Sequence, residues 1–222
     1  MIAIQDLSFG YGHGAFSLNV PALRVESGEK AAFIGPSGSG KTTLVYLIAG
    51  ILKPRSGSIM VDEREIAGRN DRWLRNFRIS RIGFVFQEFE LLDYLSVRDN
   101  MLLPYYVNDS LKPTARAHQT VEHLAASMGL ENKLKRYPRT LSQGERQRVA
   151  ICRALATSPD MVIADEPTGN LDPTAAGATL SLLLGEVERR GMMLLMVTHN
   201  HALLNSFDRV IDVREFARGE TS

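Results

Sequence analysis

The segment Gly35 to Thr42 constrains the fold of this 222-residue chain more than any other stretch. It reads GPSGSGKT and satisfies the pattern G-x-x-x-x-G-K-[ST], between a strand pattern and an apolar helix pattern, Thr42 to Ala49. In this context glycines let the backbone wrap closely, so that N–H groups and the positive helix end face phosphate oxygens. A flexible Gly/Ser linker is the alternative, but a linker need not end in Lys-Thr or lead into an apolar helix. The segment therefore predicts a phosphate-binding loop.

Two side chains at the end of this loop carry the predicted chemistry. Lys41 is expected to reach the β- and γ-phosphates of a nucleoside triphosphate. The Thr42 hydroxyl is expected to ligate Mg²⁺. The loop thus predicts a triphosphate bound together with a magnesium ion.

The rest of the chain alternates between strand and helix patterns. Loosely alternating apolar and polar residues, Ile2 to Leu7 and Phe16 to Ile34, predict a small antiparallel sheet at the start. From about Glu88 to Pro159 the apolar spacing is mostly helical, which predicts an inserted helical lobe. Strand and helix patterns alternate again from Met161 to Val213, which predicts a parallel sheet with helices on both faces. The predicted fold class is α/β.

An acidic pair follows the apolar strand pattern Met161 to Ala164. Asp165 is expected to hold Mg²⁺ through a water molecule. Glu166, on the opposite side of an extended segment, is expected to orient and deprotonate the water that attacks the γ-phosphorus. The alternative is a charged pair at the start of a surface loop. His199 and Gln87 also follow apolar strand patterns, so we expect both near the phosphates, although either residue alone is more typical of a structural role.

Composition excludes several classes of protein. Hydrophobic residues make up 44% and charged residues 23%, which argues against a disordered or membrane-embedded chain. The formal net charge is only +1, so we expect no nucleic-acid partner. The longest apolar run, Leu44 to Leu52, is far shorter than the ~20 residues of a membrane-spanning helix, and the start does not resemble a secretion signal. We expect a cytoplasmic protein in which the single Cys152 is a small buried filler.

Residues 141–145, LSQGE, followed by RQRVAICRAL, resemble the signature motif of ATP-binding cassette (ABC) ATPases. The resemblance covers essentially the whole chain, because the family's other motifs occur in the family's order. It implies a P-loop NTPase core of the ABC type, with a parallel sheet flanked by helices, an N-terminal antiparallel β subdomain and an inserted helical subdomain. Within a single ABC domain, 1–222, the implied ATPase core with its β subdomain is approximately 1–87 and 160–222. The helical subdomain with the signature is 88–159.

The resemblance also implies roles for individual residues, with Tyr11 as the aromatic residue that stacks on adenine. The implied ATP-binding residues are Tyr11, Gly35, Pro36, Ser37, Gly38, Ser39, Gly40, Lys41, Thr42 and Thr43. The implied signature residues, which complete the ATP site of a second copy, are Leu141, Ser142, Gln143, Gly144 and Glu145. The implied catalytic residues are Glu166, His199 and Gln87. The implied D-loop residue is Asp172. The implied Mg²⁺ ligands are Thr42, Gln87 and Asp165.

The implied assembly is a head-to-tail homodimer that sandwiches two ATP molecules and drives a separate polytopic membrane protein. The chain would then be peripheral on the cytoplasmic face of the inner or plasma membrane. The stretch Glu166 to Asp172, EPTGNLD, is similar to a subgroup with the lipoprotein-releasing, macrolide-efflux and cell-division ATPases. The implied function is the ATP-hydrolysing subunit of an ABC transporter or mechanotransmission complex. A regulatory ATPase that gates an extracytoplasmic enzyme without transport is the alternative.

The signature departs from the common Leu-Ser-Gly-Gly-Gln at Gln143 and Glu145. Ser142-x-x-Glu145 satisfies the capping-box pattern, in which the glutamate folds back to the serine N–H. A carboxylate aimed at the γ-phosphate would be repulsive, so we expect Glu145 to point to its own backbone or to a ribose hydroxyl. A well-capped helix with no further role is the alternative.

Two apolar or aromatic stretches, Leu91 to Leu95 and Tyr105-Tyr106, fall in a region that we expect at the surface. We expect them to help grip the membrane partner. Core packing of the helical lobe is the alternative.

Overall fold

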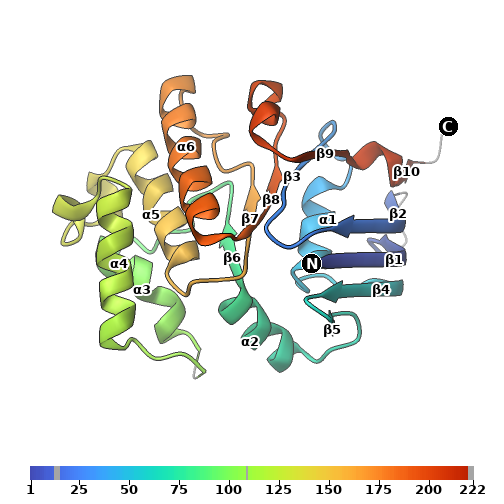
Figure 1. The fold of residues 1–222 in the computed structure, drawn as a ribbon, viewed down its shortest axis with the longest axis horizontal. Coiled ribbons are helices and arrows are strands. Elements are labelled where there is room, and N and C mark those ends of the chain that lie inside the picture. The colour runs from blue at the N-terminus through green and yellow to red at the C-terminus, as the bar shows by residue number, and fades with distance from the viewer. Residues whose placement is uncertain (13–15, 109, 220–222) are drawn as a thin grey trace. The chain divides into compact units, whose positions relative to one another are not determined.

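The computed structural model describes residues 1–12, 16–108 and 110–219 (Figure 1). The chain divides into two compact units: unit 1 is Met1–Arg78 with Met193–Ser222, and unit 2 is Ile79–Met192. Each unit contains parallel strands and helices of its own. The subdomain boundaries at residues 88 and 159 stay a prediction.

The antiparallel sheet predicted at the start of the chain lies in unit 1, with the strand order β10-β2-β1-β4-β5. Its strands are β1 (Ile2–Gly10), β2 (Phe16–Val25), β4 (Ser56–Val61), β5 (Arg64–Glu65) and β10 (Ala217–Gly219). The pairing of β1 with β4 shifts register near Asp6, whose φ is 48°. Gly57 lies against this irregularity, where a Cβ would be 2.4 Å from the Asp6 carbonyl oxygen. The irregularity keeps the apolar residues on one face, because Ile4 and Leu7 are both buried.

Three parallel strands of unit 1 position the phosphate loop. They are β8 (Met193–Val197), β3 (Lys30–Ile34) and β9 (Arg209–Asp212), with β3 in the middle. The prediction that the segment up to Ile34 belongs to the antiparallel sheet is therefore wrong for β3, because both of its neighbours run parallel to it. All of β8 is buried, as are the three central residues of β3, which is typical of strands covered on both faces. Because Phe33 lies opposite Val197, β3 and β8 end at the same edge. The segment Gly35 to Thr42 and His199 therefore emerge from that edge together.

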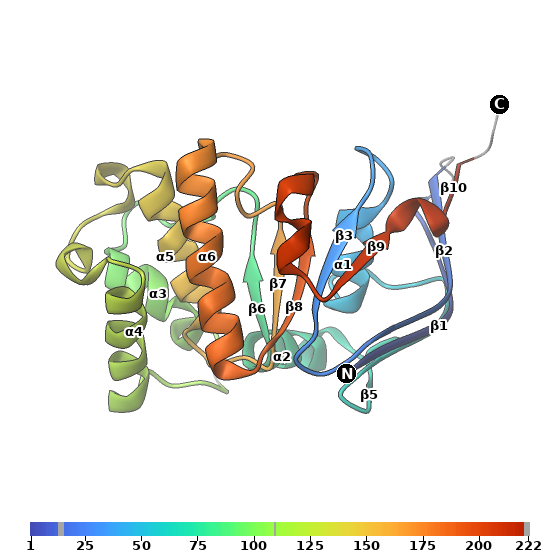
Figure 2. The ribbon, with the colours of Figure 1, turned by 45° about the horizontal axis from the view of Figure 1, so that its top comes forward.

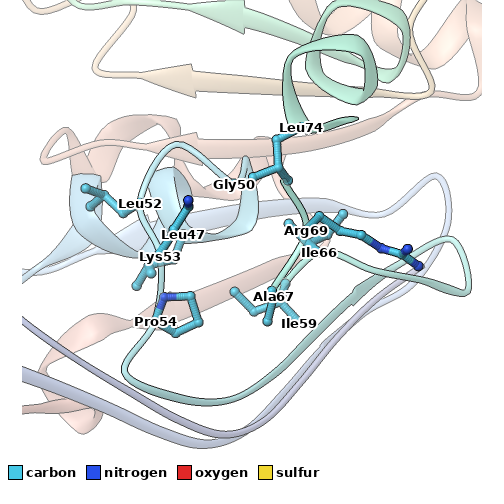
Figure 3. Close-up of a pocket in the computed structure, with 11 residues that line it drawn as sticks. Leu47, Gly50, Leu52, Lys53, Pro54, Ile59, Ile66, Ala67, Arg69 and Leu74 are labelled. Atoms are coloured by element: carbon cyan, nitrogen blue, oxygen red, sulfur yellow. The ribbon is translucent and has the colours of Figure 1, made fainter. Parts of the chain in front are cut away.

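A small hollow, with a volume of about 10 Å³, lies in unit 1 beside the end of α1 (Lys41–Ile48) and the first half of α2 (Asp71–Arg81) (Figure 3). Its walls are mainly apolar and include Leu47, Pro54, Ile59, Ile66 and Leu74. Lys53, also on the wall, pairs with Asp71 at 3.0 Å and lowers the pKa of that carboxyl group. None of the eleven lining residues is a predicted site residue, so the hollow is not the nucleotide site.

Unit 2 combines two parallel strands with four helices. The strands are β6 (Ile82–Val85) and β7 (Met161–Asp165). The helices are α3 (Val97–Tyr106), α4 (Ala115–Ser127), α5 (Gln143–Leu155) and α6 (Pro173–Arg190). Helices α3, α4 and α5 pack against one another, and α5 also packs on β6 and α6 (Figure 2). Each of these helices has an N-cap residue whose side chain accepts a backbone hydrogen bond. These residues are, in order, Ser96, Thr114, Ser142 and Asp172.

Short 3₁₀ turns connect these elements. They are η1 (Glu131–Lys133), η2 (Pro138–Thr140), η3 (His201–Ser206) and η4 (Val213–Glu215). None of the helices within the described ranges combines the length and the apolar character that crossing a membrane requires.

Cys152 lies in α5 and is fully buried. Its Sγ is 3.6 Å from the carbonyl oxygen of Leu124 in α4. Burial raises the pKa of the thiol, which keeps it protonated and unreactive. The prediction of a buried filler is therefore confirmed.

Gly83 of β6 marks a close approach of α5 to the strands of unit 2. A Cβ there would lie 2.4 Å from the carbonyl oxygen of Ala154, a backbone atom. We expect Gly83→Ala to lower the free energy of unfolding by about 3 kcal/mol, measured by urea denaturation. The control is Gly185→Ala, at an exposed α6 position with nothing within 4 Å, which is expected to be neutral or stabilising by about 0.5–1 kcal/mol. Equal stabilities of the two variants would contradict this packing.

Candidate nucleotide-binding site

The loop between β3 and α1 has the backbone that a phosphate site needs. Gly35, Gly38 and Gly40 have φ values of 146°, 79° and 93°, which other residues rarely adopt. A Cβ on Gly40 would also lie 2.8 Å from the Phe16 ring. Among the described residues no side chain caps the start of α1, so its first N–H groups stay available to an anion. The glycines of the pattern are therefore required by geometry.

Two side chains of the loop are buried within it. Lys41 is 7% exposed, and its Nζ donates to the carbonyl oxygens of Gly35 and Pro36, both at 2.9 Å. The Ser39 hydroxyl is buried and has no hydrogen-bond partner among the described residues. A buried hydroxyl without a partner is costly, and a phosphate oxygen would satisfy it. The loop thus places two hydrogen-bond donors, the Lys41 ammonium and the Ser39 hydroxyl, where a phosphate would bind.

The predicted adenine-stacking residue, Tyr11, lies in unit 1 beside α1. Its hydroxyl is 3.1 Å from Thr43 Oγ1. Its ring packs edge-on against Phe9, with 4.8 Å between centroids, and tilts against Phe16 at 5.8 Å. The side chain remains 50% exposed, which leaves room for a stacked base. Thr43 itself is 7% exposed, so the structure gives it a supporting contact to Tyr11.

His199 follows the buried end of β8. Thr198 N–H donates to the Phe33 carbonyl at 3.1 Å, which continues the pairing of β8 with β3 up to the phosphate loop. Asn200 N–H donates to Thr198 Oγ1 at 3.1 Å, and the His199 side chain is exposed. The structure therefore brings His199 to the same sheet edge as Gly35.

In unit 2, the acidic pair occupies the end of β7. Asp165 is the last residue of the strand and is 7% exposed. Glu166 has a φ of 46°, so the prediction of an extended segment with side chains on opposite sides is wrong at this residue. The chain turns here, with Gly169 N–H donating to the Glu166 carbonyl at 3.0 Å. A left-handed non-glycine residue at this point is typical of a functional site.

Gln87 lies close to this turn. Gln87 Nε2 and Glu166 Oε2 are each 3.7 Å from the point where a Gly169 Cβ would stand. Asn170 Nδ2 also donates to the Gln87 carbonyl oxygen at 3.0 Å. Two of the predicted catalytic side chains are therefore brought together within unit 2.

The signature residues begin α5. Ser142 Oγ accepts from Glu145 N–H at 3.2 Å, and Glu145 Oε2 accepts from Ser142 N–H at 2.8 Å. This is the predicted capping box, and it confirms that Glu145 points to its own backbone. The Ser142 N–H and, to a lesser degree, Lys133 lower the pKa of Glu145, so the carboxylate is charged at neutral pH.

Asp172, the predicted D-loop residue, caps α6. Its Oδ1 accepts from the N–H groups of Thr174 and Ala175, each at 3.0 Å. A Cβ on Gly144 would be 3.7 Å from the Ala175 Cβ, an ordinary contact. The first turns of α5 and α6 therefore touch, which places the signature beside the D-loop.

Three residues that the sequence did not indicate support these segments. Arg55 Nη2 donates to the Gly12 carbonyl at 2.6 Å, next to Tyr11. Asn100 is fully buried and bonds the segment after Gln87, for example Leu92 N–H at 2.8 Å. Arg153 of α5 donates to the carbonyl oxygens of Phe89, at 2.9 Å, and Glu90. Local sequence patterns do not indicate these contacts, because the partners lie 8 residues apart for Asn100 and Leu92 and 43 to 64 residues apart for the two arginines.

A glycine-lined phosphate loop, a strand-end acidic pair and a capped signature helix together define an ABC-type ATPase. The family model described as ABC transporter matches residues 18–169. The chain belongs to this family, and it is an ATP-binding, ATP-hydrolysing cassette of the ABC transporter class.

Individual relatives agree with this assignment. The chain is 41% identical over 193 residues to the lipoprotein-releasing system ATP-binding protein LolD of Hyphomonas neptunium, covering 87% of this chain and 84% of that protein. It is 37% identical over 207 residues to the ABC transporter ATP-binding protein YtrE of Bacillus subtilis, covering 90% and 89%.

Solved structures show the same fold. The chain resembles the dimeric ATP-binding cassette MJ0796 in a post-hydrolysis state with ADP and Pi, with a TM-score of 0.85, 28% identity and full coverage of both chains. It also resembles cbiO1 of Clostridium perfringens, part of the transporter complex cbiONQ, with a TM-score of 0.84 and 29% identity over 95% of this chain and 83% of that one. The predicted ABC-type α/β fold is confirmed.

Proposed function

We propose that two copies of this chain form a head-to-tail dimer around two ATP molecules and drive a separate polytopic membrane protein. The observation that carries this proposal is the start of α5, where a capping box fixes the signature residues at the positive end of the helix dipole. A signature of this kind serves the ATP of another copy. The dimeric cassette MJ0796 supports the assembly, because it resembles this chain over its full length.

In this assembly the predicted residues have different roles in ATP hydrolysis. The loop N–H groups and Lys41 bind the β- and γ-phosphates and draw negative charge toward the leaving oxygen. Glu166 accepts a proton from the attacking water, whose oxygen bonds to the γ-phosphorus as the bond to ADP breaks. His199 hydrogen-bonds toward the γ-phosphate, and Gln87 helps to orient the water.

Magnesium fits the donors that the chain offers. Thr42, Gln87 and Asp165 carry hydroxyl, amide and carboxylate oxygens, which are the hard ligands that Mg²⁺ takes. The described residues contain no group of three or more His, Cys, Asp or Glu side chains able to hold a metal ion. A nucleotide-bound Mg²⁺ needs few protein ligands, because phosphate oxygens and water complete its shell. When bound, the ion neutralises charge that develops on the phosphates.

The membrane partner is proposed to bind beside α3 at the cytoplasmic face of the membrane. Tyr94 is 76% exposed and Tyr106 54% exposed, and both are large apolar side chains. Tyr105 differs, because its hydroxyl donates to the Ala156 carbonyl at 2.8 Å. It therefore packs within unit 2, which agrees with the alternative of core packing in the helical lobe. The lipoprotein-releasing name of several relatives supports a partner of that subgroup.

The partner is tested by purifying the tagged protein from detergent-solubilised membranes of its own cells and identifying polytopic proteins that accompany it. Tyr94→Asp is expected to reduce their recovery by about fivefold or more, since it places a charge in an apolar contact. Tyr137→Asp, another exposed tyrosine of unit 2, is the control and should recover as much as the parent. Absence of a polytopic protein contradicts the proposal, and a partner attached to an extracytoplasmic enzyme would favour the regulatory alternative.

A further inference from the structure

The signature helix α5 begins beside a lysine that lies outside the signature motif. We propose that Lys133 is a positioning residue for the ATP site completed by the signature: it holds the Glu145 carboxylate against the start of α5 and cancels its charge toward the triphosphate. This inference rests on the proposed function, because that triphosphate is bound to the other copy of the dimer.

Both oxygens of the Glu145 carboxylate have a partner. Oε2 accepts from the Ser142 N–H at 2.8 Å, and Oε1 lies 3.1 Å from Lys133 Nζ. The Glu145 side chain is only 18% exposed and the Lys133 side chain 28%, so the pair is more shielded than most surface ion pairs. One contact therefore comes from the helix itself and the other from η1.

The backbone around Lys133 is held by hydrogen bonds that do not involve the ion pair. Lys133 N–H donates to the Leu130 carbonyl at 2.9 Å, and Arg136 N–H donates to the Lys133 carbonyl at 2.8 Å. The next turn is bonded to the start of α3, where Val97 N–H donates to the Arg136 carbonyl at 2.8 Å. Lys133 therefore extends from a held turn, so the ion pair has to order only the lysine side chain and not its backbone.

The charges at the start of α5 explain how Lys133 would affect the binding of a triphosphate there. The start of α5 suits an anion, because its first N–H groups and the helix dipole are positive. The common signature has a neutral glutamine where this chain has Glu145, so an added carboxylate would repel a triphosphate. Lys133 restores neutrality while the carboxylate continues to cap the helix.

The test measures dimerisation in the hydrolysis-deficient Glu166→Gln parent. At about 50 mM salt, Lys133→Ala is expected to raise the MgATP concentration for half-maximal dimerisation about five- to tenfold over the parent. At about 0.5 M salt the difference from the parent should fall below about twofold, because the charge is screened. Lys133→Arg should stay within about twofold of the parent, since it keeps the positive charge.

Two further variants separate charge from structure. Lys135→Ala removes an equal charge from an exposed position two residues along, and it should stay within about twofold of the parent. The double variant Lys133→Ala/Glu145→Gln should return to within about twofold of the parent, because it removes both charges together. Each variant should unfold within about 3 °C of the parent, as expected for partly exposed groups.

The outcomes are distinct. If Lys133→Ala dimerises like the parent at low salt, or if the double variant is as weak as Lys133→Ala, the positioning role of Lys133 is overturned. If the parent itself stays monomeric with MgATP, the proposed dimer fails, and this inference fails with it.

Discussion

Lys41→Ala is expected to lower kcat/KM for ATP about 10²- to 10³-fold, measured as phosphate release under steady-state conditions. The Lys41 ammonium is buried among the carbonyl oxygens of Gly35 and Pro36, at the centre of the phosphate loop. No other lysine or arginine lies within this loop, so its loss removes the positive side chain that is proposed to bind the β- and γ-phosphates. Nucleotide affinity, followed by calorimetry, should fall as well.

Lys53→Ala is the matched control for this variant. Lys53 belongs to the same unit, but its side chain is 65% exposed and pairs with Asp71 at the surface. Its removal should change activity by less than about twofold and stability by less than about 1 kcal/mol. If Lys41→Ala kept more than about a tenth of the parent's kcat/KM, the phosphate role of Lys41 would be contradicted.

Glu166→Gln is expected to lower kcat about 10³-fold while KM for ATP changes less than about threefold. The amide keeps the size of the side chain but accepts no proton from water. The left-handed turn at Glu166 and the nearby Gln87 amide should remain, since the turn is held by a backbone hydrogen bond. Glu131→Gln, at an exposed position of η1, should retain full kcat. Retention of more than about a third of kcat by Glu166→Gln would exclude it as the general base.

The phosphate loop and the capping box could be predicted because neighbouring residues fix each of them. The glycines of the loop are needed for local φ values, and Glu145 reaches Ser142 within one helical turn. Both patterns can therefore be recognised in a short window of sequence. The alternating strand pattern likewise indicated the antiparallel sheet.

Other features depend on contacts between distant segments. The Lys133–Glu145 pair joins η1 to α5, and Arg55 reaches Gly12 from the connection between α1 and β4. The strand β10 pairs with the edge of β2, about 200 residues earlier in the chain. Hydrophobic spacing carries no information about such pairings.

Two local interpretations also needed the structure. Strand alternation suggested an extended Glu166, but β7 ends at Asp165 and the chain turns there. Tyr105 and Tyr106 are adjacent in sequence, yet only Tyr106 is exposed, because the Tyr105 hydroxyl bonds the end of α5. An aromatic pair at a helix end does not reveal which ring faces the core.

The most direct test of the ATP-dependent dimer is the mass of Glu166→Gln in solution, measured by size-exclusion chromatography with light scattering. With saturating MgATP we expect a particle of twice the 24.6 kDa mass of one chain, and with ADP a particle of one chain. A Ser142→Arg variant in the same background should remain monomeric, because its bulk and lost cap disturb the signature. A Glu166→Gln protein that stays at 24.6 kDa in saturating MgATP would show that ATP does not hold two copies together.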